Sequence, residues 1–312
     1  MEYSFLLLIL IPLVTAFLIP LVDIIYHKIR KILVVFSVLS ELLLGISLLI
    51  YNYQKVLSGS LAVEYNLGGW TSSLGITLVM DSLGLFFTTL ISISLFLIII
   101  YSIGFIGHHE GKYYVLLFLL FAAMQGAILT GDIFNLYVFI ELITITSAAL
   151  VAFHRNRESA EASFKYLLYG VIGGLFFLIA VFLLYYNLGT LNMNIISNNI
   201  GQINVNMQYT ILIFFMTAVL IKLGIFPFHY WLPKAHSACP GPISALLSGV
   251  LLKVFIYMFI RLFWPVLGFG LISSVGLKNF LIYLGLFSST LGHLLALRED
   301  DIKRMLAFST VG

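Results

Sequence analysis

Charged side chains are scarce in this sequence of 312 residues, where Asp, Glu, Lys and Arg together make up only 9%. Soluble domains carry about 25% charged and about 45–50% apolar residues, whereas 61% of this chain is hydrophobic. The composition excludes an ordinary soluble domain and predicts an all-α protein that crosses a lipid bilayer several times. The formal net charge of +3 is small, and we expect no nucleic-acid partner.

Cysteine is almost absent as well. Cys239 is the single cysteine, which excludes an internal disulfide bond and an iron–sulfur cluster held by this chain alone. His229 and His236 are seven residues apart, but no carboxylate or cysteine completes a metal-binding set with them. Glycine-rich phosphate loops, nucleophile elbows and haem motifs are missing too. We therefore expect no cofactor, no metal and no catalytic site in this chain.

Long apolar runs, in contrast, are abundant. A helix needs about 20 mostly apolar residues to span a bilayer, and nine runs approach or exceed this length. They cover residues 3–22, 32–51, 82–103, 113–130, 133–153, 163–187, 208–228, 242–264 and 279–297. A tenth stretch begins near Asp301 and is too short to cross. The first run follows Glu2 rather than a basic segment, which favours a membrane span over a cleavable signal peptide.

The basic residues outside these runs are unevenly distributed. If the side of the 23–31 loop is called the inside, eleven of the sixteen lysines and arginines lie in inside loops and three lie outside. Lys222 and Lys253 are left within the membrane. Because cytoplasmic loops are enriched in basic residues, the distribution predicts that the 23–31 loop is cytoplasmic and the N-terminus is outside.

Three connections have patterns of their own. Residues 52–81 alternate in polarity and contain Gly68-Gly69, which predicts a short β-hairpin. Residues 188–207 carry no charge and many asparagines, which favours a surface loop. Residues 154–165 are polar on one side, so we expect a short amphipathic segment at the membrane interface.

Glu141 lies about eight residues into the run 133–153, near the middle of the membrane. Tyr137, Glu141 and Thr144 are spaced so that they share one helix face. A carboxylate cannot face lipid cheaply, and an ionisable group at this depth points to an ion pathway. The alternative is a buried Glu–Lys pair that only holds helices together.

Lys222 and Lys253 also lie deep within apolar runs, where a charge costs at least roughly 2.5–3.5 kcal/mol. Lys222 is followed by Gly224 and Pro227, which break the helix, and broken helices frame ion sites in transporters. The alternative is an ordinary proline kink with a lysine that reaches the interface. Lys253 is eleven residues into its run, too deep to reach the interface fully.

Other ionisable residues are weaker candidates. Glu41 lies in the middle of the second run and should be buried or paired, in a proton pathway or at a subunit interface. His293, near the inner end of the ninth run, can carry a proton near neutral pH or be purely structural. Lys165 and His236 complete the set of candidate secondary relays. Asp132 is expected to be a helix N-cap.

Three segments together resemble a known family. They are GDIFNLYVFIEL, KLGIFPFHYWLPKAHSACPGPISALLSGVLLK and EDDIKRMLAFSTVG, and their order and spacing agree over roughly residues 110–312. They resemble the antiporter-like proton-translocating subunits of respiratory complex I, Mrp-type cation/proton antiporters and membrane-bound hydrogenases. The resemblance implies a unit of five helices with one broken helix, repeated in inverted orientation, in a prokaryotic plasma membrane.

The resemblance also implies roles for particular residues. Glu141, Lys222 and Lys253 match the proton-relay set of the first half-channel, and His229 and His293 match secondary relays. The expected partners are other membrane subunits, including further antiporter-like ones, together with protons, sodium ions and the lipid bilayer. A non-conducting subunit that scaffolds a partner is the alternative, and a quinone-binding redox subunit is weaker.

The sequence departs from the family in length. Members usually have about fourteen spans, so we expect the second half-channel to be incomplete, in a split subunit or in a shortened chain. The resulting division is residues 1–110 as N-terminal helices, 111–264 as the first five-helix unit and 265–312 as the start of a second unit.

Overall fold

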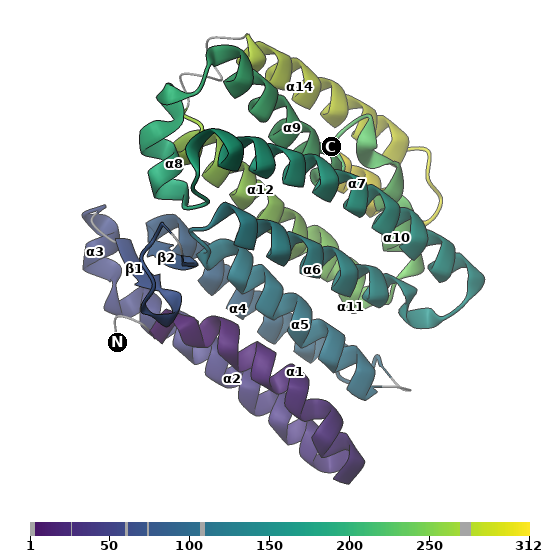
Figure 1. The fold of residues 1–312 in the computed structure, drawn as a ribbon. Coiled ribbons are helices and arrows are strands. Elements are labelled where there is room, and N and C mark those ends of the chain that lie inside the picture. The colour runs from purple at the N-terminus through teal and green to yellow at the C-terminus, as the bar shows by residue number, and fades with distance from the viewer. Residues whose placement is uncertain (1–3, 26, 60–61, 74, 107–109, 269–275) are drawn as a thin grey trace. The chain divides into compact units, whose positions relative to one another are not determined.

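The computed structural model describes residues 4–25, 27–59, 62–73, 75–106, 110–268 and 276–312, most of which are helical (Figure 1). The α-helices are α1 (Leu7–Ile25), α2 (His27–Tyr51), α3 (Tyr53–Leu57), α4 (Ser82–Ser102), α5 (Glu110–Leu129), α6 (Ile133–Val151), α7 (Arg157–Leu188), α8 (Met193–Asn199), α9 (Val205–Leu223), α10 (Trp231–Ala238), α11 (Gly241–Leu246), α12 (Leu252–Arg261), α14 (Leu277–Ala296) and α15 (Ile302–Val311). Two π-helical segments cover Leu247–Leu251 and Leu262–Val266. The strands are β1 (Ala62–Asn66) and β2 (Thr77–Asp81).

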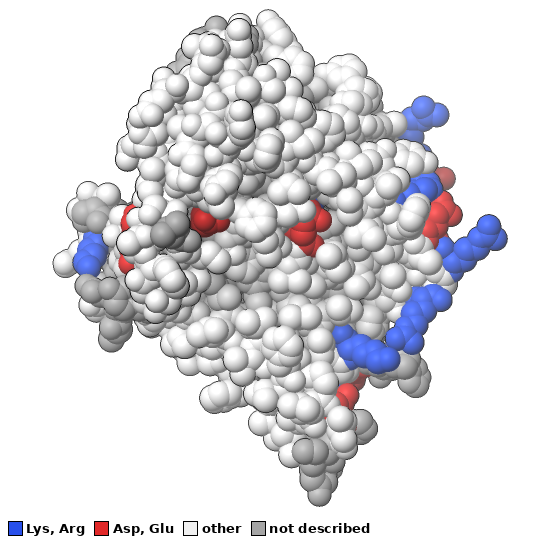
Figure 2. Space-filling view, in the orientation of Figure 1, with Lys and Arg blue, Asp and Glu red and all other residues white. Residues whose placement is uncertain are grey.

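Nine helical stretches among the described residues are long and apolar enough to cross a membrane. They are Ser4–Ile24, Ile29–Tyr51, Ser82–Ser102, Glu110–Leu129, Ile133–His154, Arg157–Leu188, Val205–Ala238, Gly241–Val266 and Leu277–Ala296. The prediction of an all-α membrane protein with nine spans is confirmed. Figure 2 shows a face on which few side chains are acidic or basic, as expected of a surface that contacts lipid.

Three connections differ from the predictions. In the 23–31 range, α1 continues to Ile25 and α2 begins at His27, and residue 26 lies outside the described part. The expected amphipathic segment at 154–165 is mostly the start of α7, because Asn156 forms a capping box with Ser159 and starts a helix there. The expected loop at 188–207 contains α8.

The predicted hairpin between residues 52 and 81 is confirmed for its described residues. The five residues of β1 pair antiparallel with the five residues of β2. Gly68 has φ +68° in the connection, a conformation that glycine adopts readily. The side chain of Asp81 then accepts a hydrogen bond of 2.7 Å from the Gly84 N–H, which caps α4 and joins the hairpin to that helix.

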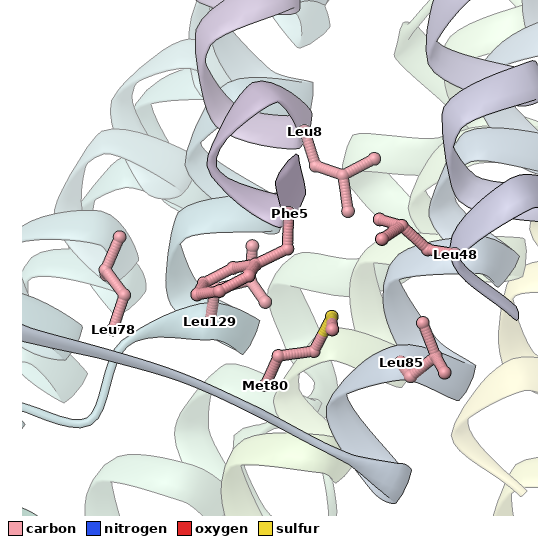
Figure 3. Packing of buried hydrophobic residues seen from close by; sticks show 7 residues of the cluster. All are labelled: Phe5, Leu8, Leu48, Leu78, Met80, Leu85 and Leu129. Carbon is pink, nitrogen blue, oxygen red and sulfur yellow. The ribbon is translucent and has the colours of Figure 1, made fainter. Parts of the chain in front are cut away.

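The chain forms two compact units, the first comprising Met1–Gly131 and Val138–Leu150. In this unit α1 packs against α2 and α5, and α4 packs against the same two helices. Figure 3 shows a cluster of buried side chains from the helix ends and the hairpin, made of Phe5, Leu8, Leu48, Leu78, Met80, Leu85 and Leu129. This cluster fastens the hairpin to the helices.

The second unit comprises Asp132–Tyr137 and Val151–Gly312. Here α7 packs against α9 and α10, α12 against α9, and α15 against α10 and α14. At Gly173 of α7, an added Cβ would lie 3.2 Å from Cγ2 of Ile221 on α9, so the missing side chain allows the two helices to approach closely. The predicted division of the chain into N-terminal helices, a five-helix unit and the start of a second unit, at residues 110 and 264, stays a prediction.

Candidate functional site

Lys222 lies in the last turn of α9, immediately before the helix breaks. The residue is only 4% exposed. Gly224 ends the helix with φ +65°, and its N–H donates to the Ile221 carbonyl at 3.2 Å. The last carbonyls of a helix carry partial negative charge, which favours an ammonium group at this position. The C-terminal end of α9 therefore stabilises the buried ammonium group of Lys222 electrostatically.

The irregular backbone after α9 is covered and hydrogen-bonded by protein. The indole N–H of Trp231, at the start of α10, donates to the Ile221 carbonyl at 3.2 Å. The N–H of Ile225 donates to the Leu220 carbonyl, also at 3.2 Å. Irregular backbone is tolerated at membrane depth only where its polar groups have such partners. The predicted break between Lys222 and Pro227 is confirmed, and the Phe226–Pro227 peptide bond is cis.

Lys253 lies two residues beyond the π-helical segment Leu247–Leu251. In a regular α-helix the N–H of Leu252 would bond the Ser248 carbonyl, but here it donates to the Leu247 carbonyl, five residues back. The Lys253 ammonium donates to the Ser248 carbonyl at 2.7 Å. The Lys253 ammonium therefore bonds a carbonyl that has lost its α-helical donor, the Leu252 N–H, to the π-helical turn. Because α9 and α12 pack against each other, the two lysines are carried on neighbouring helices.

Glu141 lies on α6 and is partly buried. It belongs to the first unit, whereas Lys222 and Lys253 belong to the second. Thr144, one turn further along the helix, is buried and donates its hydroxyl hydrogen to the Ile140 carbonyl at 2.8 Å. At the start of α6 the predicted N-cap is confirmed, because the Asp132 carboxylate accepts a hydrogen bond of 2.7 Å from the Asn135 N–H.

The three candidate histidines occupy different environments. The ring of His229 lies near the rings of Phe226 and Phe308, with centroids 5.5 and 6.4 Å away, and its buried Nδ1 has no hydrogen-bond partner among the described residues. His236 is 2% exposed, with Nδ1 3.1 Å from the Ser244 hydroxyl. His293 is exposed on α14, with Nδ1 2.8 Å from a backbone carbonyl of its own helix.

Lys165 belongs to a charged cluster where α7 meets α10. It pairs with Glu161 on the same helix, and the Lys234 ammonium lies 4.0 Å from the same carboxylate. The Lys234 ammonium is also 4.6 Å from the centroid of the Tyr230 ring. A cavity of about 300 Å³ opens here, lined by Glu158, Glu161, Ala162, Lys234, Ser237 and Arg304. Glu158 and Glu161 were not predicted from the sequence as part of a site, although the spacing of Glu161 and Lys165 by four residues is a recognisable helix pair.

Glu41 lies on α2 and is 1% exposed. One of its carboxyl oxygens, Oε1, accepts a hydrogen bond of 3.0 Å from Nε2 of Gln125 on α5. Sequence reasoning predicted that Glu41 is buried or paired, and the structure places it in the first unit. Among the described residues, no group of three or more His, Cys, Asp or Glu side chains is arranged to hold a metal ion.

Comparison with protein families matches residues 130–312 to a model described as NADH:quinone oxidoreductase/Mrp antiporter, transmembrane. A Na(+)/H(+) antiporter subunit of Alkalihalophilus pseudofirmus is 31% identical over 289 residues, which are 92% of this chain and 57% of that protein. An NADH-quinone oxidoreductase subunit of Desulforudis audaxviator is 32% identical over 254 residues, which are 80% of this chain and 50% of that protein.

Solved structures show the same fold. A chain of the membrane-bound sulfane sulfur reductase, an archaeal respiratory membrane complex, superposes with a TM-score of 0.89 at 32% identity, over 99% of this chain and 62% of the other. A chain of the Mrp complex from Dietzia has a TM-score of 0.83 at 24% identity, over 99% of this chain and 57% of the other. The chain thus spans about half to three fifths of the length of these relatives.

Proposed function

Because the chain belongs to the NADH:quinone oxidoreductase/Mrp antiporter transmembrane family, we propose that it translocates protons, or exchanges sodium ions for protons, as an antiporter-like subunit. Its partners are other membrane subunits of an energy-converting complex, among them further antiporter-like subunits. These supply the driving force, either redox chemistry or a cation gradient. The 23–31 connection faces the cytoplasm of a prokaryotic cell and the N-terminus faces outside.

The observation that carries this proposal is the position of Lys222. The residue is 4% exposed, at the end of a helix that breaks inside a membrane-spanning stretch. A charged group at this depth is costly and is kept where ions or protons move. Broken helices whose ends frame the ion are a recurrent way to build such a site. In our proposal Lys222 is the central proton carrier.

Glu141 and Lys253 complete the proposed relay. Glu141 acts as a charge switch in this scheme, because a change in the charge of a carboxyl group alters how strongly a lysine of the relay holds its proton. Lys253 receives the proton from Lys222 and passes it towards the second half-channel. Its hydrogen bond to the Ser248 carbonyl fixes the position of the ammonium group beside the π-helical segment. His229, His236, His293 and Lys165 are secondary relays in this scheme.

The test is ion translocation by the assembled complex in membrane vesicles, with Glu141→Gln and Lys222→Ala as the variants. Each is expected to lower the initial rate of proton or sodium movement at least tenfold, while the complex still assembles on native gels. Lys55→Ala is the matched control, because Lys55 is exposed on α3. Normal rates in both relay variants would instead show that the chain is a non-conducting scaffold.

A further inference from the structure

A polar cluster lies between α2, α4 and α5 in the first unit, apart from the lysines at the broken helix. Glu41 and Gln125 are each 1% exposed. Nε2 of Gln125 donates to Oε1 of Glu41 at 3.0 Å, and it also lies 3.2 Å from the Ser92 hydroxyl and 3.3 Å from the Thr88 carbonyl. The cluster is therefore built by side chains from three helices.

The cluster contains more hydrogen-bond acceptors than donors. Oε2 of Glu41 and Oε1 of Gln125 are buried and have no hydrogen-bond partner among the described residues. The Ser92 hydroxyl lies close to the Glu41 carboxyl as well, and its single hydrogen is directed to the Thr88 carbonyl at 3.0 Å. The Thr89 hydroxyl donates to the Leu85 carbonyl at 2.8 Å. Oε2 of Glu41 and Oε1 of Gln125 are therefore buried acceptors without a hydrogen-bond donor from the residues that the structure describes.

Glu41 has no ion-pair partner in the described part of the chain, so no basic residue there compensates a charge at this position. Along α2, Arg30 and Lys31 are eleven and ten residues away, which is about 15–17 Å at 1.5 Å per residue. The other charged or titratable residues of α1 to α5 lie towards the helix ends: Asp23 on α1, His27, Lys28 and Tyr51 on α2, Tyr53 and Lys55 on α3, Tyr101 on α4, and Glu110, Lys112, Tyr113 and Tyr114 on α5. On α6, which meets α5 at Gly126, Glu141 is acidic and so cannot act as a counter-ion.

We propose that Glu41 and Gln125 form a buried proton-binding site, in which Glu41 carries a proton on Oε2 at neutral pH. An isolated carboxylate in an apolar interior is strongly unfavourable, whereas a protonated carboxyl is neutral. The protonated form also supplies the missing O–H donor and leaves Oε1 as the carbonyl oxygen that accepts from Gln125. A bridging water would bond both oxygens but would leave the charge uncompensated. A hard cation needs about six or more oxygen ligands, more than the two free oxygens here.

The proposal goes beyond the translocation pathway through Glu141, Lys222 and Lys253, and it does not depend on it. The site lies in the first unit and holds a proton whether or not the chain conducts ions. A glutamine at position 41 would match a protonated glutamate in shape. The glutamate differs because it can release its proton when the surroundings change, so the site is able to store and return one proton.

Infrared spectroscopy of the full chain in lipid nanodiscs, with any co-purified subunits, tests the proposal. The wild type is expected to show the C=O stretch of a protonated carboxyl at pH 7, and Glu41→Gln is expected to lose this band. Glu158→Gln is the control, because Glu158 is exposed on the surface, and this substitution is expected to leave the band unchanged. A band unchanged by Glu41→Gln would overturn the proposal, as would stabilisation of the wild type, but not of Glu41→Gln, by sodium over potassium.

A second variant keeps the test decisive if Glu41→Gln does not accumulate. Gln125→Met removes the donor to Oε1, and a carbonyl that loses a hydrogen bond absorbs at higher frequency. We therefore expect the same band to shift upwards in Gln125→Met, and an unshifted band would contradict the assignment to Glu41. Both spectra are recorded without ion movement, so loss of translocation and loss of the proton site can be told apart.

Discussion

The Lys253 ammonium donates a hydrogen bond of 2.7 Å to the Ser248 carbonyl, five residues earlier in the same spanning stretch. The bond exists because the π-helical segment redirects the Leu252 N–H to the Leu247 carbonyl. π-helical turns inside α-helices occur frequently at functional sites. The lysine thus has a structural partner as well as a proposed part in proton transfer, and the two roles are separable by experiment.

Replacing Lys253 with Met removes the donor to the Ser248 carbonyl. A buried acceptor left without its donor costs about 1–3 kcal/mol, so we expect the free energy of unfolding in detergent to fall by that amount. Ser248→Ala is the control, because it keeps the backbone carbonyl and the lysine, and it is expected to change stability much less. Equal stabilities of wild type and Lys253→Met would contradict the structural role.

Replacing Trp231 with Phe removes the indole N–H that bonds the Ile221 carbonyl beside Lys222. The loss of this bond is expected to destabilise the chain by about 0.5–1.5 kcal/mol, because the Ile221 carbonyl keeps its hydrogen bond from the Gly224 N–H. It is also expected to slow ion translocation, because fewer hydrogen bonds hold the helix break in place. Thermal unfolding and vesicle assays measure the two effects. Trp70→Phe serves for comparison, since Trp70 is 65% exposed and its replacement should alter neither quantity.

Replacing Gly126 with Ala introduces a methyl group where the ring of Phe139 already lies, on the neighbouring helix α6. Overpacking of this kind typically costs about 1–3 kcal/mol. A second change, Phe139→Ala, vacates the space, so the double variant should show a favourable coupling energy in a double-mutant cycle. Additive effects of the two substitutions would rule out the contact.

Gly285 provides the matched control for Gly126. It lies inside α14, and an added Cβ there meets nothing within 4 Å. Alanine is a better helix former than glycine by about 1 kcal/mol. Gly285→Ala is therefore expected to leave stability unchanged or to raise it slightly, in contrast to Gly126→Ala.

Replacing Arg30 with Met breaks two ion pairs at once. Arg30 Nη1 lies 2.5 Å from Asp23 Oδ1, and Nη2 contacts Glu110, so this side chain links α2 to α1 and α5. Removing one partner of a buried pair costs about 3–5 kcal/mol. Because the two carboxylates keep 27% and 20% exposure, we expect a smaller loss of about 2–3 kcal/mol here. Denaturation midpoints measure it.

Arg30→Lys and Lys55→Met are the comparisons for this substitution. A lysine keeps the charge but cannot bond two carboxylates with a planar fork, so it should recover only part of the lost stability. Lys55 is exposed, and its replacement should stay within about 0.5 kcal/mol of the wild type. Full recovery by Arg30→Lys would show that the geometry of the guanidinium is unimportant.

Much of the fold and part of the site could be predicted from the sequence. The nine spans were predicted because membrane crossing depends on hydrophobicity added over about 20 consecutive residues, which is a local property. The hairpin and the break after Lys222 were predicted for the same reason, since glycine and proline act on their own stretch of backbone. The start of α7 was misjudged because one capping box at Asn156 outweighed the polar appearance of the segment.

The sequence by itself determined that this is a membrane protein with ionisable residues inside its spans. Only the tertiary structure decided which groups those residues meet. Glu41 and Gln125 are 84 positions apart and are joined by the packing of α2, α4 and α5. Hydrogen-bond partners depend on how helices pack, and a π-helical turn depends on packing on both sides of it. Neither is contained in the hydrophobic pattern of a single stretch, and so the surroundings of each buried charge appear only in the folded chain.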